Sequence, residues 1–196
     1  MNPEQQQDYS FLTQNNGPKR MSFGSPNSQK QRIMLVGVIA GIVILLLVVG
    51  MILINIFSVD NTKKLTDLAA YQTEASRIMS LGAESAKDSN LRVAAQTASS
   101  TFSTHTQKTI AIASKKSIKI NDKQLQSLKS SATDKNLESA KIANNYDEVF
   151  KKAYQEIINA YLSKLRTLRL EETDKTINSA LIEYIEEANE LSKSLQ

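Results

Sequence analysis

The chain has 196 residues, a formal net charge of +4, a single histidine and no cysteine. Without cysteine there are no disulfides, thiolate metal sites or catalytic thiols. Beyond residue 32 the basic and acidic side chains nearly balance. This is not the charge distribution of a nucleic-acid-binding protein, so we expect no nucleic-acid partner.

Residues 1–32 form a polar segment rich in Gln, Asn, Ser, Pro and Gly, and it contains all three prolines. Such a segment buries too little apolar surface to offset the entropy lost on ordering. We therefore predict a disordered tail at the N-terminus.

Residues 33–57 form an uncharged and strongly apolar stretch. As a helix it would extend about 37 Å, more than the hydrocarbon core of a bilayer, which is about 30 Å thick. A cleaved signal peptide would have a shorter apolar run followed by a small-residue cleavage site, and no such site follows here. We predict an uncleaved signal anchor, that is, a single transmembrane helix in the lipid bilayer.

The charges that flank this stretch predict its orientation. Four cations precede it with no acid after Asp8, whereas the lysines that follow it are mixed with aspartates; the cations are Lys19, Arg20, Lys30 and Arg32. Cytoplasmic flanks carry the excess of Lys and Arg. We predict a single-pass protein of the cell membrane with a cytoplasmic N-terminus and an extracytoplasmic domain, residues 58–196.

Two glycines in the apolar stretch, Gly37 and Gly41, lie four residues apart. Small residues at this spacing let two membrane helices approach closely. They are candidates for a transmembrane helix contact that would form a weak homodimer.

The domain at 58–196 is predicted to be all-α, because it has one glycine and no proline for the turns of a β-protein. Apolar residues recur at three- and four-residue spacing in four long segments, 61–87, 91–116, 145–169 and 175–195. The residues around 114–144 are less regular and indicate two short helices. The pattern predicts an antiparallel four-helix bundle with one long, partly helical crossover.

The domain lacks the residues of a catalytic or metal site. A ferritin-type di-metal site needs Glu three residues before a histidine, but Phe102 stands three residues before His105. A Ser–His–acid set would need a strand–turn–helix elbow, and phosphate loops need glycines. We predict no enzyme activity, no catalytic residue, no metal and no other cofactor.

Four polar side chains fall on the apolar stripes and are candidates for a cleft or a polar core: His105, Tyr154, Tyr161 and Tyr184. The histidine is either a ligand or proton-transfer group, or a structural residue hydrogen-bonded to a neighbouring helix. The tyrosines either line a ligand pocket or pack in the core with their hydroxyls at its rim. The carboxylates at 186, 187 and 190 are expected to face solvent.

Residues 74–76, 81–92 and 102–105, followed by Tyr146-Asp147 and Tyr154, resemble the bacterial DUF4142 family. The resemblance covers roughly residues 65–195. It implies an exported, ferritin-like helical bundle and supplies no reaction. Thr104 stands where the family usually has Asp before the histidine, so no role is carried over to His105.

These observations favour a membrane-anchored, extracytoplasmic helical bundle with a non-enzymatic interaction or structural role in the cell envelope. Its partner would be another envelope protein or component. One alternative is a small-ligand sensor coupled through the transmembrane helix. Another is a ferritin-like metal-binding protein.

Overall fold

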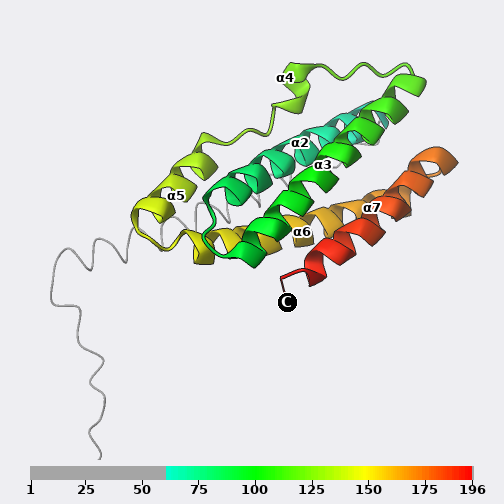
Figure 1. Ribbon diagram of the computed structural model, residues 1–196. Coiled ribbons are helices and arrows are strands. Elements are labelled where there is room, and N and C mark those ends of the chain that lie inside the picture. The colour runs from blue at the N-terminus through cyan, green and yellow to red at the C-terminus, as the bar shows by residue number, and fades with distance from the viewer. Residues whose placement is uncertain (1–60, 196) are drawn as a thin grey trace, which may run out of the picture. The chain divides into compact units, whose positions relative to one another are not determined.

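The computed structural model describes residues 61–195, and every regular element within them is a helix (Figure 1). The helices are α2 (Asn61–Ser85), α3 (Ser89–Lys115), α4 (Asp122–Leu125), α5 (Ser131–Ile142), α6 (Tyr146–Glu171) and α7 (Lys175–Lys193). The all-α prediction is confirmed for these residues. The four long helices lie within a few residues of the four predicted segments.

The predicted membrane anchor is outside this region. No helix among residues 61–195 has the length and apolar character needed to cross a bilayer. The predicted tail at 1–32 and the predicted transmembrane helix at 33–57, with Gly37 and Gly41, lie outside the described residues. The anchor and its orientation therefore stay predictions.

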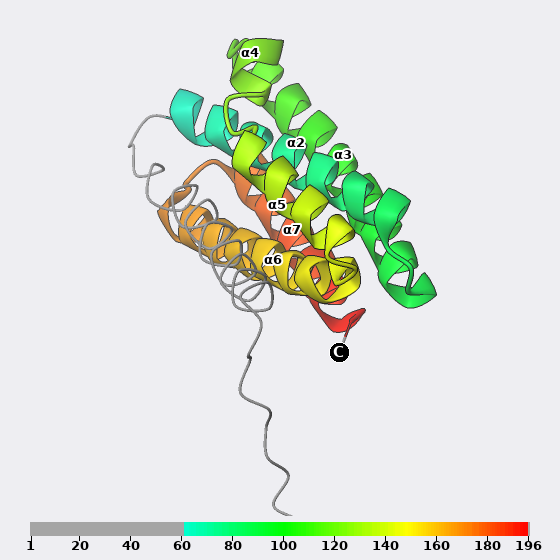
Figure 2. The same cartoon turned by 90° about the vertical axis from the view of Figure 1, so that its left-hand side faces the viewer.

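Helices α2 and α3 pack along their lengths as a hairpin, side by side in Figures 1 and 2. Serines line part of their contact. The hydroxyl of Ser76 donates to the carbonyl oxygen of Ser99 at 2.9 Å, and the hydroxyls of Ser80 and Ser99 lie 2.8 Å apart. Small side chains at a helix contact allow a short distance between the two axes.

The turn between α2 and α3 is held by two aspartates. Asp88 caps α3, since its carboxylate accepts the backbone N–H of Leu91 at 2.8 Å. Asp147, in the first turn of α6, accepts the backbone N–H groups of Lys87 and Asp88 at 2.9 and 2.8 Å. These donors have no partner within a helix, so α6 completes the hydrogen bonding of the first hairpin.

The crossover from α3 to α6 contains the two short helices α4 and α5. A capping box begins α4, because Asn121 and Gln124 each accept the other's backbone N–H at 2.9 Å. Helix α4 packs on α2, and α5 packs on α6 (Figure 2). Arg77 of α2 pairs with Glu74 at 2.7 Å and with Asp134 of α5 at 2.6 Å, which ties the crossover to the first hairpin.

The core lies between the four long helices, and the predicted apolar stripes supply most of it. The stripe predicted for the last two long segments also included Leu195, which is only partly buried. The other predicted stripe residues on α6 and α7 are buried: Phe150, Ala153, Tyr154, Ile157, Tyr161, Leu165, Leu168, Ile177, Leu181, Tyr184, Ala188 and Leu191. On α3 the fully buried stripe ends at Ala113, and Ile112 is only partly buried. The helix faces were thus predicted correctly for most of the core.

Gly82 of α2 faces the ring of Phe150 on α6, and the ring fills the space that a side chain at this position would need. A Cβ atom there would lie 1.8 Å from Cζ of Phe150, and 2.2 and 2.3 Å from the ring's two Cε atoms. The Phe150 ring is fully buried and stacks on Tyr146 at 5.8 Å between centroids. The glycine therefore makes room for the ring.

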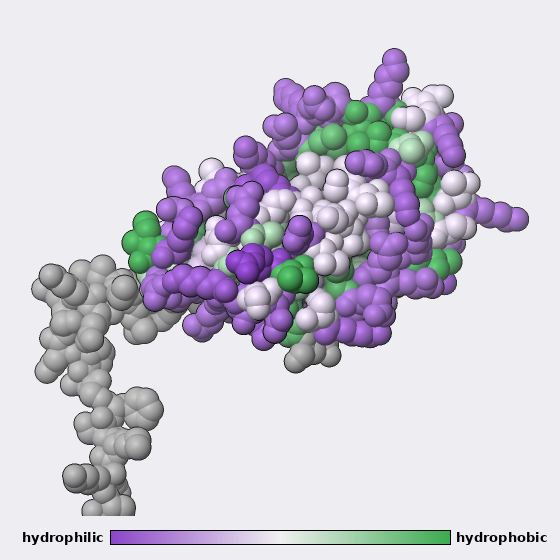
Figure 3. All heavy atoms as spheres, viewed as in Figure 1, coloured by the Kyte–Doolittle hydropathy of each residue, from purple (hydrophilic) through white to green (hydrophobic). Residues whose placement is uncertain are grey.

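The face of the bundle seen in Figure 3 is mostly hydrophilic. Among residues 62–195 the exposed large apolar side chains are Val93, Ile142, Leu170 and Ile182, one on each of α3, α5, α6 and α7. Apolar side chains exposed singly are normal on soluble surfaces. They do not single out a binding face.

Candidate functional site

His105 is fully buried in the core, on the inner face of α3. Its Nδ1 atom lies 3.0 Å from the hydroxyl oxygen of Tyr161 on α6. Its Nε2 atom lies 2.9 Å from a carboxylate oxygen of Glu187 on α7. The imidazole thus bridges two helices, and the Glu187 side chain, 42% exposed, leads from it to the surface.

Further hydrogen bonds extend from Tyr161 through the core. Gln72 of α2 donates its Nε2 to the Tyr161 hydroxyl at 2.8 Å and accepts from the hydroxyl of Thr109 at 2.9 Å. The hydroxyls of Thr109 and Tyr184 are 3.3 Å apart, and Tyr184 donates to the carbonyl oxygen of His105 at 3.2 Å. We call these six residues the polar chain: Glu187, His105, Tyr161, Gln72, Thr109 and Tyr184.

The order of donors in the polar chain determines where the proton of neutral His105 lies. Gln72 donates to Tyr161, so the Tyr161 hydroxyl uses its own hydrogen toward Nδ1 of His105. The ring hydrogen is then on Nε2, where it is donated to Glu187. Each buried polar group in the polar chain has a partner, as burial requires.

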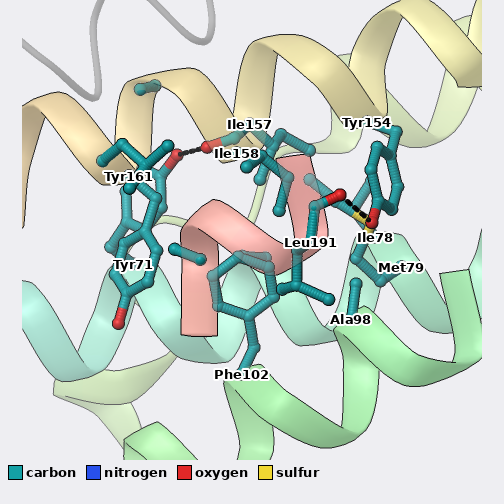
Figure 4. Close-up of a cluster of buried hydrophobic side chains, with 14 of the residues drawn as sticks. Tyr71, Ile78, Met79, Ala98, Phe102, Tyr154, Ile157, Ile158, Tyr161 and Leu191 are labelled. Atoms are coloured by element: carbon teal, nitrogen blue, oxygen red, sulfur yellow. Dashed lines mark hydrogen bonds between the residues drawn. The ribbon is translucent and has the colours of Figure 1, made fainter. Parts of the chain in front are cut away.

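Aromatic rings hold the polar chain in place. The ring of Tyr161 stacks on that of Tyr71 (Figure 4). Their centroids are 5.7 Å apart and their planes differ by 5°. Phe102 meets the same ring edge-on at 5.0 Å. On the other side, the ring of Tyr184 lies 4.1 Å from that of His105. This packing holds the Tyr161 and His105 rings in place, while the hydroxyl hydrogen of Tyr161 can still rotate about its C–O bond.

The four residues singled out from the sequence divide into two places. His105, Tyr161 and Tyr184 meet in the polar chain. Tyr154 lies elsewhere and donates its hydroxyl hydrogen to the carbonyl oxygen of Leu191, at 3.1 Å (Figure 4). The Tyr154 hydroxyl is also 3.0 Å from the hydroxyl of Ser194. The two remaining candidates, Gly37 and Gly41, are outside the described residues.

Three residues of the polar chain were not predicted: Gln72, Thr109 in its hydrogen-bonding role, and Glu187. Gln72 lies four residues after Leu68 and three before Ala75, so it falls on the predicted stripe of α2 and is fully buried. Glu187 was expected to face solvent, but its carboxylate turns inward to His105. Spacing could have found Gln72, since its position is that of a core residue.

Burial and neighbouring charges act in opposite directions on His105. Desolvation lowers the pKa of the imidazole from its usual value and is the largest effect. The hydrogen bond and charge of Glu187 and the charge of Glu183 raise the pKa, whereas Lys108 lowers it. Burial raises the pKa of Tyr161 well above its usual range and that of Tyr184 to about 12, so both phenols keep their protons.

Folding stability should therefore depend on pH through His105. Because its pKa is lower in the folded chain than the usual 6.5, the unfolded chain binds the proton more tightly. The stabilisation is complete above about pH 6.5 and is lost as the pH falls toward the folded pKa. Urea unfolding of the full chain and of His105→Gln, in detergent between about pH 7 and about pH 5, should show a steeper pH dependence for the unsubstituted chain. Equal slopes would contradict it.

Lys164 of α6 is a second buried polar group, separate from the polar chain. Its Nζ is buried without a hydrogen-bond partner among the described residues and lies 5.2 Å from the ring centroid of Tyr71. Desolvation lowers its pKa from 10.5 to about 8, and the charge of Asp67 opposes this. The position costs stability, because the cation has lost its water and gains no hydrogen bond among the described residues in return.

Every member of the polar chain is buried except the Glu187 side chain, which is 42% exposed. Among residues 61–195, no group of three or more His, Cys, Asp and Glu side chains is placed to hold a metal ion. A surface hollow between α3 and α7, lined by Lys108, Ile112, Ala180 and Glu183 with their neighbours, contains no residue of the polar chain. The chemistry available at the polar chain is proton uptake and release at His105, with Glu187 as the route to solvent.

Comparison with protein-family models, with curated proteins and with solved structures gives no match for this chain. The resemblance to the DUF4142 family stays a prediction. The function must then be inferred from the residues and their geometry.

Proposed function

We propose that this chain is a membrane-anchored helical-bundle module that works outside the cytoplasm in a non-enzymatic interaction or structural role in the cell envelope. Residues 33–57 supply the anchor in the lipid bilayer, and the four cations before them favour a cytoplasmic N-terminus. The domain is an antiparallel four-helix bundle of the ferritin-like kind. Its partner is another envelope protein or component, and Gly37 and Gly41 add a weak homodimer contact in the membrane.

The observation that supports this proposal best is the use of the one histidine. Both ring nitrogens of His105 are engaged by Tyr161 and Glu187, and the ring is fully buried. A catalytic base must reach the proton that it abstracts from a substrate. Here the buried polar groups hydrogen-bond to one another and link the helices. This arrangement suits a module that presents a stable outer surface.

The orientation can be tested with a reporter enzyme that is active only outside the cytoplasm. Fused after Gln196, the reporter should be active in cells. The same reporter fused after Arg32, before the apolar stretch, should be inactive at equal expression and serves as the matched control. An inactive fusion after Gln196 would refute the extracytoplasmic assignment.

The interaction role needs a second experiment. The full chain and a control of residues 1–60 would be purified from membranes after crosslinking. We expect an envelope component that is recovered with the full chain and missing from the control. Identical recovery with both, or none with either, would count against the interaction role while leaving the membrane orientation intact.

A sensor is the second candidate function, and the Glu187–His105 pair favours it. A titratable group that reaches the surface through a half-exposed carboxylate can respond to conditions outside the bundle. In this alternative the bundle transmits a change through residues 33–57. A ligand or pH change that alters crosslinking between anchors would support the sensor.

A further inference from the structure

Apart from Glu187, the polar chain starts and ends on His105. It leaves the His105 ring at Nδ1, passes Tyr161, Gln72, Thr109 and Tyr184, and returns to the carbonyl oxygen of His105. Every member between these two ends is a hydroxyl or a primary amide. Each such group both donates and accepts hydrogen bonds, so the hydrogen bonds along the polar chain can be donated in either of two directions.

With His105 neutral, the structure contains the first direction. Tyr184 donates to the His105 carbonyl, Thr109 to Gln72, Gln72 to Tyr161, and Tyr161 to Nδ1. The Nε2 hydrogen goes to Glu187. In this arrangement the only hydroxyl hydrogen of Thr109 is donated to Gln72, so Thr109 does not donate to Tyr184.

Protonation of His105 adds a hydrogen to Nδ1, so Nδ1 can no longer accept the hydrogen bond from Tyr161. Nδ1 then carries a hydrogen and faces the hydroxyl of Tyr161, whose own hydrogen must find another acceptor. Unless Gln72 turns, its amide nitrogen also points a hydrogen at Tyr161. The Tyr161 oxygen can accept from both donors, but its own hydrogen is then left without an acceptor, which is unfavourable in a buried site.

A half-turn of the Gln72 amide resolves the conflict. Tyr161 then donates to Gln72 Oε1, the amide nitrogen donates to Thr109, and Thr109 donates to Tyr184 across their 3.3 Å contact. Tyr184 still donates to the His105 carbonyl. Every member again has a partner. The hydrogen bonds between Nδ1 of His105 and Thr109 now run in the opposite direction, and a hydrogen bond from Thr109 to Tyr184 is gained.

We propose that the polar chain is a proton-operated switch, in which uptake of one proton by His105 turns over the Gln72 amide and reverses the hydrogen bonds as far as Tyr184. The members lie on α2, α3, α6 and α7, so a single proton changes hydrogen bonds on all four long helices. The switch goes beyond the proposed function and does not depend on which partner the bundle has.

The groups around His105 determine the pH at which the switch operates. Burial of the ring has the largest effect and disfavours the protonated form; Glu187 and Glu183 of α7 favour that form, and Lys108 of α3 opposes it. Helix α6 contributes the uncharged phenol of Tyr161. Helix α2 contributes Gln72, and Tyr71 stacks behind Tyr161 without a charge. The half-exposed Glu187 is the path by which the proton arrives.

The test is a pH titration of the full chain in detergent micelles, followed by nuclear magnetic resonance between about pH 8 and about pH 5. The ring nitrogens of His105 and the side-chain amide of Gln72 would be observed together. We expect the Gln72 signals to move with the same midpoint as His105. A fixed Gln72 amide during the titration, or a His105 that stays neutral until the chain unfolds, would overturn the proposal.

Tyr161→Phe removes the link between His105 and Gln72, so His105 should titrate while the Gln72 amide stays fixed. Tyr154→Phe is the matched control, because its hydroxyl lies on the same helix but bonds to Leu191 and Ser194. The control should keep the coupled titration. Coupling that persists in Tyr161→Phe would also overturn the switch.

Glu187→Gln provides a second test that does not disturb the core, because this side chain is half-exposed. Loss of the carboxylate should weaken proton binding at His105 by about tenfold or more. The midpoints of His105 and Gln72 should move together to lower pH. If only the His105 midpoint moved, the two groups would be independent and the proposal would fail.

Discussion

Replacing Gly82 with alanine should destabilise the bundle by about 3 kcal/mol, although alanine is the better helix former by about 1 kcal/mol. The added Cβ would lie 1.8 Å from Cζ of Phe150, so the overlap outweighs the gain in helix propensity. The ring cannot swing away easily, because it is fully buried between Tyr146 and Tyr154. Urea unfolding of the full chain in detergent, followed by circular dichroism, measures the loss.

A second substitution tests whether the ring is the cause. Phe150→Leu alone should cost about 1–2 kcal/mol, since it shortens a buried side chain. In the double variant Gly82→Ala/Phe150→Leu, the total loss should be smaller than the sum of the two single losses. Additive losses, or a Gly82→Ala variant as stable as the unsubstituted chain, would show that α2 and α6 do not meet at this glycine.

Replacing Lys164 with methionine should stabilise the folded chain by about 2 kcal/mol at neutral pH. The buried amine has a pKa lowered to about 8, which corresponds to a cost of about 3 kcal/mol for keeping its proton. Part of the gain is offset, because Asp67 loses the attraction of Lys164. Methionine keeps the unbranched shape and the contact with the Tyr71 ring.

The pH dependence separates this effect from better packing. Since the folded pKa of Lys164 lies below the unfolded one, stability should rise between about pH 8 and about pH 10.5 and the Lys164→Met variant should lack this rise. Lys151→Met is the matched control, an exposed lysine on the same helix, and should change stability by less than about 0.5 kcal/mol. A destabilised Lys164→Met with an unchanged pH profile would refute the buried cation.

Helical periodicity was sufficient for most of the fold. The buried faces of α6 and α7 were mostly predicted correctly, because aliphatic and aromatic residues there repeat every three or four positions. On α2 the same spacing includes Gln72, which is fully buried but was not predicted as a core residue because its side chain is polar. Periodicity identifies the inner face of a helix, whereas residue type alone misled at this site.

The candidate site was only partly predictable. His105, Tyr161 and Tyr184 were named because they fall on inner faces, but periodicity within one helix does not say which residue of another helix lies opposite. Glu187 lies three residues after Tyr184, close enough for a flexible side chain to turn from solvent to His105. The register between α3 and α7 decides this contact, and it emerges only when the helices are packed.

Asp147 has a consequence for how the chain folds. Its carboxylate, at the start of α6, provides the acceptors for two backbone N–H groups in the turn between α2 and α3. Until α6 docks, the first hairpin therefore has a turn whose amides are bound only by water. Asp147 is synthesised about sixty residues after this turn, so the first hairpin leaves the ribosome before its turn can be hydrogen-bonded by α6. The two hairpins therefore reach their final stability together.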